Sequence, residues 1–456
     1  MSSGKGTAGA KRAKGAGGAT AGARVSGAAG ADAATGPATT GAVRATGGAC
    51  AETAGAQAPP GPAAPDAVRV PGPAGGRTSG VNLLALRSHN TALVLDLLRR
   101  AGADGISRLE LAEGTGLTPQ AVSKITARLR ERGLAAEAGR RASTGGKPRT
   151  VLRLVPEAGH AVGVHADRDE LRTVLVDLNG TVAAERRGPL EFGAGAEAVV
   201  EWVAAQVEAL VAEVFGPGPS AADPLAGAPV PLTRVDSLVG VGVALPGPLD
   251  HARGVLHRVT GFPEWDGFGL RDALGRRLGV PVVVDKDTNA AALGLAVAGA
   301  GDSFAYLHLG TGLGAGLVIG GGVHRGARTG AGEFGHQVIQ LDGPRCECGD
   351  HGCLEALCLA AVERGDLAEA ARVLGAGAAN LVGLLDIDRV LLGGRTVAAA
   401  PEVFVAGVGA VVAARARREG LPQDAVPVRP APGGERAVAV GAAQLLLGPV
   451  FGRGDG

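Results

Sequence analysis

Three of the chain's five cysteines lie within eight residues, and this cluster constrains the fold more than any other feature of the sequence. They are Cys346, Cys348 and Cys353, and His336 precedes the first of them by ten positions. Three thiolates and one imidazole complete the tetrahedral set that zinc takes in structural sites, with no open position for water. Glycines inside the cluster let the backbone turn tightly enough for the thiolates to converge. The sequence therefore predicts a structural zinc site rather than a catalytic one.

The same thiols could instead form a disulfide with spare cysteines, or be buried and inert. Five cysteines in 456 residues, without an apolar segment typical of a secretory signal, argue against a disulfide framework. The sequence also has no long apolar stretch of the kind that spans a membrane. We therefore expect zinc as a structural cofactor and a cytoplasmic location.

The residues around the cluster carry a specific family resemblance. Gly330–His336 reads G-A-G-E-F-G-H, and Cys346–Glu355 reads C-E-C-G-D-H-G-C-L-E. This pair of motifs resembles the signature of the ROK family (repressors, open reading frames, sugar kinases). The likeness extends from about Leu152 to Leu447, and it implies an α/β fold with the two lobes of actin/hexokinase-like kinases. Because the family contains both enzymes and repressors, other parts of the sequence must distinguish them.

Composition and charge divide the chain into three predicted parts. Residues 1–80 are mostly Ala, Gly, Pro, Thr and Ser, and we predict a disordered tail because such a segment buries too little apolar surface. Residues 81–155 hold 13 Lys and Arg against 6 Asp and Glu, whereas the residues after 155 hold 24 against 35. A basic front end favours contact with a polyanion, although a solvated basic face would give the same count. We assign residues 81–155 to a DNA-binding domain and residues 156–450 to the ROK domain.

The segment 81–155 has the pattern of a helix-turn-helix. Ser107-x-x-Glu110 is a capping box that begins one short helix, and Thr118 with Pro119 begins the next. A basic Gly-Gly-Lys-Pro hairpin follows, and the whole segment resembles the winged helix at the front of ROK repressors. An amphipathic three-helix unit without a DNA role would fit the apolar stripe but would not need the basic hairpin. The predicted DNA-binding residues are Gln120, Ser123, Lys124, Thr126 and Arg128 in the helix, and Arg141, Lys147 and Arg149 in the hairpin.

The first phosphate-binding turn of the ROK kinases is altered in this chain. The turn reads Asp-x-Gly-Gly-Thr in the kinases, where glycines admit the phosphates and the aspartate helps to position Mg²⁺. Here His165 stands for the aspartate, and residues 167–169 read Asp-Arg-Asp. Two carboxylates in the place of a triphosphate predict that ATP does not bind and that the chain is not an enzyme. A second glycine loop at 310–314 is intact, but glycine there could serve the shape of the turn alone.

The resemblance also implies a sugar pocket. The positions that match the family's sugar-binding residues are Asp287, Glu333, His336 and Glu355. Asp287 stands at the position of the general base, which we predict to be inactive here and to accept hydrogen bonds from sugar hydroxyls. The alternative is that this carboxylate only pairs with Lys286 or with neighbouring backbone. Of the family's two pocket asparagines, one is replaced by Lys286 and the other falls on Thr260 or Gly261.

Lys286 adds a cation to a predicted pocket that is otherwise rich in carboxylates. A cationic donor at this place offsets part of the repulsion that an anionic ligand would meet. We therefore predict an effector with a negative group, such as a phosphosugar or a sugar acid. The alternative is that Lys286 forms an ion pair with Asp285 or Asp287, or turns toward solvent.

These features together predict a DNA-binding transcriptional regulator of sugar metabolism, most simply a repressor. A winged-helix head would read an operator, and a non-catalytic ROK domain would sense a sugar or a phosphosugar. We expect a homodimer or higher homo-oligomer, because two heads can read half-sites roughly 34 Å apart or a multiple of that distance. One alternative is an active ROK sugar kinase with an added DNA-binding head. Another is a regulator that has lost its ligand and binds DNA constitutively.

Overall fold

The structure is a computed structural model that describes residues 89–141, 149–216, 231–257, 259 and 262–453. The predicted tail at 1–80 lies outside these residues, and so do Lys147, Thr260 and Gly261. The predicted boundary between tail and head also falls outside them. It stays a prediction, as does the boundary between the head and the ROK domain.

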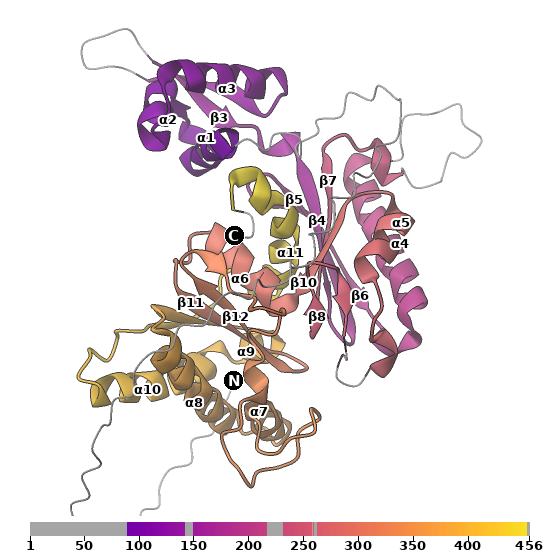
Figure 1. The fold of residues 1–456 in the computed structure, drawn as a ribbon, viewed down its shortest axis with the longest axis vertical. Helices are drawn as coiled ribbons and strands as arrows, with labels where there is room; N and C mark the ends of the chain where they lie inside the picture. Colours follow the sequence, from indigo (N-terminus) through magenta and orange to yellow (C-terminus); the bar gives the residue numbers. More distant parts are fainter. Residues whose placement is uncertain (1–88, 142–148, 217–230, 258, 260–261, 454–456) are drawn as a thin grey trace, which may run out of the picture. The chain divides into compact units, whose positions relative to one another are not determined.

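The first described elements are three helices and a small three-stranded sheet (Figure 1). Ser107 and Glu110 form the predicted capping box, and Thr118 caps the following helix with Pro119 in its first turn. The three helices enclose a core of Leu95, Leu98, Leu111, Val122 and Leu129, all of which are buried. The helices are α1 (His89–Ala101), α2 (Arg108–Thr115) and α3 (Pro119–Glu131). The strands, in the order β1-β3-β2, are β1 (Ile106–Ser107), β3 (Arg149–Leu154) and β2 (Ala135–Arg141).

The next part of the chain, the first lobe, is built on a five-stranded mixed sheet. Its order is β10 (Val282–Lys286), β7 (Leu238–Leu245), β4 (His160–Ala166), β5 (Glu170–Asp177) and β6 (Val182–Pro189). The strands β4, β7 and β10 are parallel, and β5 and β6 continue antiparallel. Two further short strands, β8 (Leu249–Asp250) and β9 (Val255–Leu256), form a separate hairpin.

Helices cover both faces of this sheet (Figure 1). On one face lie α4 (Ala196–Phe215) and α5 (Leu270–Leu278), whose apolar residues join a core that includes the buried Trp265. On the other face lies α11 (Ala437–Leu447), which approaches β4 so closely that a Cβ at Gly163 would lie 1.9 Å from the Ala439 carbonyl oxygen. Glycine at 163 therefore makes this helix–sheet contact possible.

The second lobe contains another five-stranded sheet. Its order is β13 (Gly322–Val323), β12 (Leu313–Ile319), β11 (Phe304–Leu309), β14 (Arg389–Gly393) and β15 (Val428–Pro430). One face packs on α6 (Asp287–Val297), which also packs along α11 in a shared core. The other face carries α7 (Leu354–Glu363), α8 (Leu367–Leu385), α9 (Arg395–Ala399) and α10 (Pro401–Arg418). The predicted α/β fold with two kinase-like lobes is confirmed.

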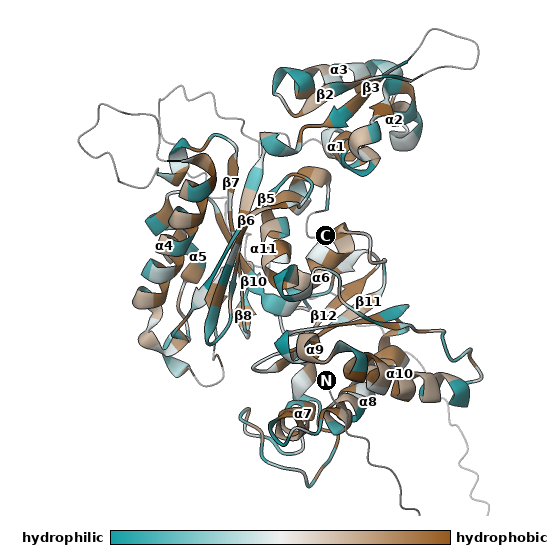
Figure 2. Ribbon diagram, turned by 180° about the vertical axis from the view of Figure 1, so that it is seen from behind, coloured by the Kyte–Doolittle hydropathy of each residue, from teal (hydrophilic) through white to brown (hydrophobic). Residues whose placement is uncertain are grey.

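The inner strands of both sheets are mostly hydrophobic, as the brown colour in Figure 2 shows. Such strands are expected where helices cover both faces of a sheet. The helix α8 is long and apolar enough to cross a membrane by length and composition, and half of its apolar window is buried inside the fold. Its buried residues belong to the core of the second lobe, which accounts for its composition.

Candidate functional site

The predicted zinc ligands converge in the second lobe. The Sγ atoms of Cys346, Cys348 and Cys353 and a ring nitrogen of His336 all lie within 4.8 Å of one another. The Sγ atoms of Cys348 and Cys353 are 3.7 Å apart, and so are Cys346 Sγ and His336 Nδ1. A tetrahedral zinc ion with Zn–S bonds of about 2.3 Å places its sulfurs roughly 3.8 Å apart. The four residues therefore fit zinc, and the S···S distance excludes the alternative of a Cys348–Cys353 disulfide.

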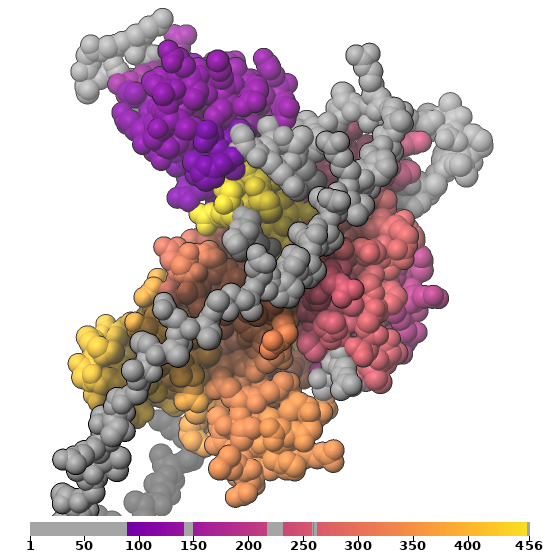
Figure 3. Space-filling model, in the orientation of Figure 1, coloured from indigo at the N-terminus to yellow at the C-terminus, as the bar shows by residue number. Residues whose placement is uncertain are grey.

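The two roles predicted for His336 are compatible. Its Nδ1 atom faces Cys346, and the same side chain lines a cavity on its other side. Zinc bound at Nδ1 would leave Nε2 protonated, and this N–H would be free to donate a hydrogen bond. The segment that carries the cluster lies at the surface, where it is coloured orange in Figure 3. Cys348 is exposed, whereas Cys346 and Cys353 are buried.

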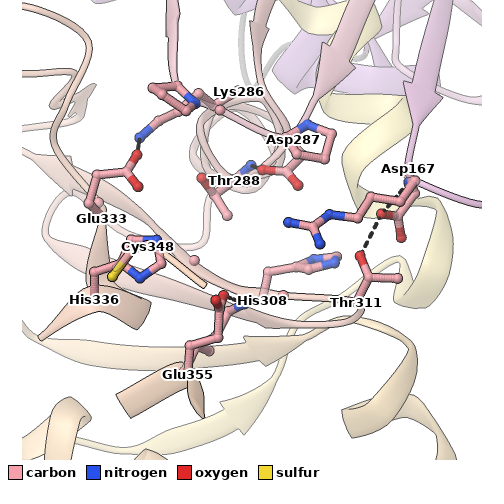
Figure 4. A pocket seen from close by; sticks show the side chains of 18 residues that line it. Asp167, Lys286, Asp287, Thr288, His308, Thr311, Glu333, His336, Cys348 and Glu355 are labelled. Atoms are coloured by element: carbon pink, nitrogen blue, oxygen red, sulfur yellow. Dashed lines mark hydrogen bonds and ion pairs between the residues drawn. The ribbon is translucent and has the colours of Figure 1, made fainter. Parts of the chain in front are cut away.

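A cavity of about 350 Å³ gathers the predicted effector residues (Figure 4). Lys286 ends β10, Asp287 begins α6, and Glu355 lies in the first turn of α7. Glu333 precedes the short helical turn Phe334–His336, and His336 is the last residue of that turn. Asp167 and Arg168 of the altered phosphate turn close the other side. Residues nearly 190 positions apart in the sequence thus line one cavity of a size usual for small-molecule sites.

The Lys286 ammonium is already bound inside this cavity. Its Nζ atom donates to Glu333 Oε1 at 2.9 Å and to the Ala331 carbonyl oxygen at 2.6 Å, and its side chain is only 3% exposed. Asp285, one of the partners considered from the sequence, instead receives hydrogen bonds from Arg325 and Asn289. The lysine therefore neutralises Glu333 and offers little charge to a ligand.

Asp287 lies at the N-terminus of α6 with its carboxylate turned toward the cavity (Figure 4). It accepts a hydrogen bond from the Thr288 backbone N–H at 2.6 Å, and no ion pair links it to another described residue. Burial raises the pKa of this carboxyl; the nearby His308 opposes the shift, and the charge of Asp167 adds to it. A partly buried carboxylate without a cationic partner is a strong acceptor for ligand hydroxyl groups.

Glu355 is held by the second glycine loop. Its Oε2 atom accepts a hydrogen bond from the Leu313 backbone N–H at 2.7 Å. A Cβ at Gly312 would lie only 3.0 Å from the same oxygen. The glycine at 312 therefore makes room for a side chain of the cavity, which supports the interpretation that the loop is needed for its shape.

The altered phosphate turn is bound to the second lobe. Asp167 accepts a hydrogen bond from the Thr311 hydroxyl at 2.9 Å, and Asp169 forms a bidentate ion pair with Arg395 at 2.9 and 3.0 Å. The two carboxylates are thus partly neutralised, so repulsion of a triphosphate is weaker than the sequence alone indicates. The Arg395 side chain lines a separate cavity of only about 40 Å³.

His165 takes the place of the kinase aspartate inside the protein. Burial lowers the pKa of its imidazole to about 4, against an opposing effect of Asp167, so the ring is neutral at pH 7. Its Nε2 atom has no hydrogen-bond partner among the described residues. A neutral ring offers none of the oxygen ligands that Mg²⁺ prefers.

Sequence reasoning missed four residues of this region. His308 and Thr311 line the large cavity, and Arg168 does so beside them. Arg395 follows the glycine pair 393–394, and nothing in the local sequence indicates that it reaches Asp169, which is 226 positions away. The Arg-for-Gly replacement at 168 is visible in the sequence, and it could have indicated a cationic side chain at the cavity.

Most of the residues predicted to contact DNA from α3 are exposed. These are Gln120, Ser123, Lys124 and Arg128, and Arg149 is exposed at the start of β3. The expectation for Thr126 is wrong. It is completely buried, and its hydroxyl donates to the Val122 carbonyl oxygen at 2.9 Å, because position 126 lies one turn after Val122 on the inner face of the helix. The side chain of Arg141 and the whole of Lys147 lie outside the described residues.

Known proteins match this chain over both sequence and fold. Residues 231–365 match the ROK family. The DNA-binding transcriptional dual regulator NagC of Escherichia coli K12 is 30% identical over 289 residues, which cover 62% of this chain and 66% of NagC. The xylose repressor of Bacillus subtilis is 28% identical over 256 residues, which cover 55% of this chain and 61% of that protein. The chain thus spans less than two thirds of the length of either relative.

Solved structures extend the likeness to the fold. A ROK family transcriptional regulator, described as a homologue of the E. coli MLC protein, has a TM-score of 0.61 at 21% identity, covering 80% of this chain and 97% of that one. A ROK family glucokinase from Streptomyces griseus, in complex with glucose and AMPPNP, has a TM-score of 0.50 at 27% identity, covering 63% and 99%. The ROK signature, the match of residues 231–365 and the likeness to NagC together show that the chain carries a ROK family domain.

Proposed function

We propose that the protein is a DNA-binding transcriptional regulator, acting as a repressor of carbohydrate-metabolism genes, whose ROK domain senses a sugar or sugar derivative without phosphorylating it. The observation that carries this proposal is the presence of both parts in one chain. A winged helix exposes Gln120, Ser123 and Lys124 on α3, and a cavity lined by Asp287, Glu355 and other polar residues lies in the kinase-like body. The similarity to NagC, a DNA-binding transcriptional dual regulator, and to a xylose repressor supports this combination.

The α3 side chains would supply sequence readout in a major groove. Glutamine, serine and lysine can hydrogen-bond base edges, and the exposed Arg128 and Arg149 can bind phosphates. We infer a homodimer, because two such heads would read two half-sites of a palindromic operator. A regulator of this kind works in the cytoplasm, where the DNA is.

The cavity would hold a sugar through carboxylates that accept hydrogen bonds from hydroxyl groups. Asp287 and Glu355 have no cationic partner among the described residues, so their oxygens remain strong acceptors. Zinc, when bound, would fix the ring of His336 at the wall of the cavity and join it to the loop 346–353. This metal would have a structural role, and the effector would be bound by protein side chains alone.

Loss of kinase activity follows from the phosphate turn. His165 stands in the place of the metal-binding aspartate of the kinases, and Asp167 and Arg168 line the cavity where their phosphate-binding glycines would be. Asp287 would then lack a phosphoryl donor. The alternative is an active ROK kinase. It is tested below because the chain is similar in fold to a ROK family glucokinase.

A contact route connects the cavity with the DNA-binding head. The helix α6 begins at Asp287 in the cavity, and the Ala296 carbonyl oxygen near its other end accepts a hydrogen bond from Arg453 at 3.2 Å. The Arg453 guanidinium also lies 3.7 Å from the Asp96 carboxylate of α1. Movement of α6 on ligand binding would therefore change a contact made by the head.

The test combines DNA binding with enzymology on the full chain. Selection from a random DNA library would identify the operator, and fluorescence anisotropy would measure affinity for it. We expect saturable binding that Lys124→Ala weakens, together with no sugar-dependent ADP formation in a coupled assay with hexoses and ATP. Sequence-independent binding that Lys124→Ala leaves unchanged, or clear ADP formation, would reject the proposal.

A further inference from the structure

The large cavity has two chemically different ends (Figure 4). Lys286, Glu333 and His336 lie at one end, and Asp167 and Thr311 lie at the other. Asp287 and Glu355 lie between them, and both present carboxylates toward the open space. A ligand that fills the cavity therefore meets hydroxyl-binding groups along its body and a different set of groups at the end formed by the phosphate turn.

Only two Lys or Arg side chains line the cavity in the part of the chain that the structure describes, and only one of them is available to a ligand. Lys286 is buried and bound to Glu333 and to the Ala331 carbonyl oxygen. Arg168 is 26% exposed, and its Nη1 atom lies 3.8 Å from Glu347 Oε2. Glu347 is itself 71% exposed, so solvent screens this long contact. The N–H donors of the Arg168 guanidinium are therefore available to an anionic group of a ligand.

The carboxylates on either side of Arg168 in the sequence do not occupy its guanidinium. Asp167 accepts from the Thr311 hydroxyl and from the Arg168 backbone N–H, and it lies 3.8 Å from Arg395. Asp169 is held by Arg395 through both of its oxygens. Arg395 therefore neutralises part of the negative charge of residues 167–169 without lining the large cavity. The Arg168 guanidinium, which lines that cavity, is not needed for this role.

From these contacts, and resting on the proposed sugar-sensing function, we propose that the effector is a sugar monophosphate whose phosphate is bound by Arg168. A guanidinium binds phosphate oxygens in a bidentate way that an ammonium cannot match. Asp287 and Glu355 accept hydrogen bonds from the hydroxyl groups of the sugar. One phosphate group is enough to engage the one guanidinium that is available in the cavity. The anionic group predicted from the sequence is kept, but the cation that binds it is Arg168 instead of Lys286.

Isothermal titration of the zinc-loaded full chain tests the assignment with matched ligands. The panel pairs free hexoses, pentoses and N-acetylhexosamines with their monophosphates, and it includes gluconate and inorganic phosphate. For one sugar, the phosphorylated member should bind at least roughly tenfold more tightly, as expected for a hydrogen-bonded charge pair. Inorganic phosphate should compete with that ligand, and rising salt should weaken the phosphorylated member more than the free sugar.

Three variants locate the effect. Arg168→Gln should reduce the preference for the phosphorylated member to about onefold and abolish competition by inorganic phosphate. Glu347→Gln should strengthen binding of the phosphorylated member modestly, because it removes the exposed carboxylate that lies 3.8 Å from the Arg168 guanidinium. Arg276→Gln, which changes an exposed arginine of α5, is the matched control and should bind as the wild type does.

The outcomes separate this inference from the function on which it rests. A free sugar that binds as tightly as its phosphate, or a phosphate preference that survives Arg168→Gln, would overturn the inference and leave a sugar sensor. Tighter binding of gluconate than of any phosphosugar would also overturn it, in favour of a sugar acid. If no member of the panel binds while the operator is still bound specifically, both the inference and the sensing role are wrong, and the chain is a ligand-free DNA-binding protein. If Arg168→Gln does not fold, Glu347→Gln still tests the inference: tighter binding of the phosphorylated sugar supports it, and unchanged binding contradicts it.

Discussion

Replacement of a single zinc ligand should release the metal and destabilise the second lobe. Cys348 is the best position for this test, because its side chain is exposed and Cys348→Ser removes no buried apolar contact. The loss of stability can then be assigned to the metal. Because zinc binds the folded site more tightly than it binds the unfolded chain, its binding free energy contributes directly to the stability of the fold.

The size of the effect follows from linkage. A ligand present at 1,000 times its Kd stabilises the folded state by about 4 kcal/mol. For a domain of this size, each kcal/mol changes Tm by roughly 2–4 °C, so the loss of zinc should lower Tm by roughly 10 °C. The same decrease should follow when a chelator is added to the wild type, and the chelator should have little effect on Cys348→Ser.

The measurements are metal content by mass spectrometry and melting temperature with and without chelator. The matched control is Cys358→Ser, which alters a completely buried thiol that donates to the Ala370 carbonyl oxygen and is no ligand of the cluster. This control should keep about one zinc per chain, although it loses some stability. A Cys348→Ser protein that retains zinc and melts as the wild type does would refute the site.

Three further predictions concern the head, the cavity and the route between them. Lys124→Ala should change which operator sequences are preferred, whereas Arg149→Ala should weaken all sequences alike and lower the salt slope of binding by about 1, as titration over a salt series would reveal. Burial raises the pKa of the Asp287 carboxyl in the folded state, so ionisation of this group destabilises the fold as the pH rises above about 4, the pKa of an aspartate in the unfolded chain. Asp287→Asn should therefore stabilise the protein more at pH 7 than at pH 4, as measured by urea unfolding. Equal effects at both pH values would contradict the raised pKa. Arg453→Ala should preserve effector affinity in calorimetry but reduce the change in operator affinity that the effector causes, and undiminished coupling would exclude this route.

Local patterns in the sequence predicted the local structure well. The capping box at Ser107 and Glu110 and the cap at Thr118 depend on residues three positions apart, and both form as expected. The convergence of His336 with three cysteines was also predictable, because three of the four residues lie within eight positions and their chemistry leaves few alternatives. The two lobes followed from the family resemblance, and periodicity alone would not have indicated them.

Contacts between distant residues were beyond the reach of sequence reasoning. Thr126 was misplaced because its face on α3 depends on how the helix packs, and a polar residue gave no sign that it would bond back to Val122. Lys286 was predicted to face a ligand, but its partner Glu333 is 47 positions away and is brought near by the fold. The Asp169–Arg395 pair joins the two lobes in the same way, so the charge available to a ligand could not be summed from the sequence.

The most direct test of a sugar-responsive repressor is an anisotropy titration of the full chain against its selected operator, with and without a saturating sugar monophosphate and in the absence of ATP. We predict that the ligand weakens operator binding by at least roughly tenfold, which corresponds to a coupling free energy of about 1.4 kcal/mol. The change should require Asp287 and should not require a nucleotide. Operator affinity that is the same with every sugar and phosphosugar tested, or that changes only when ATP is added, would contradict the proposed function.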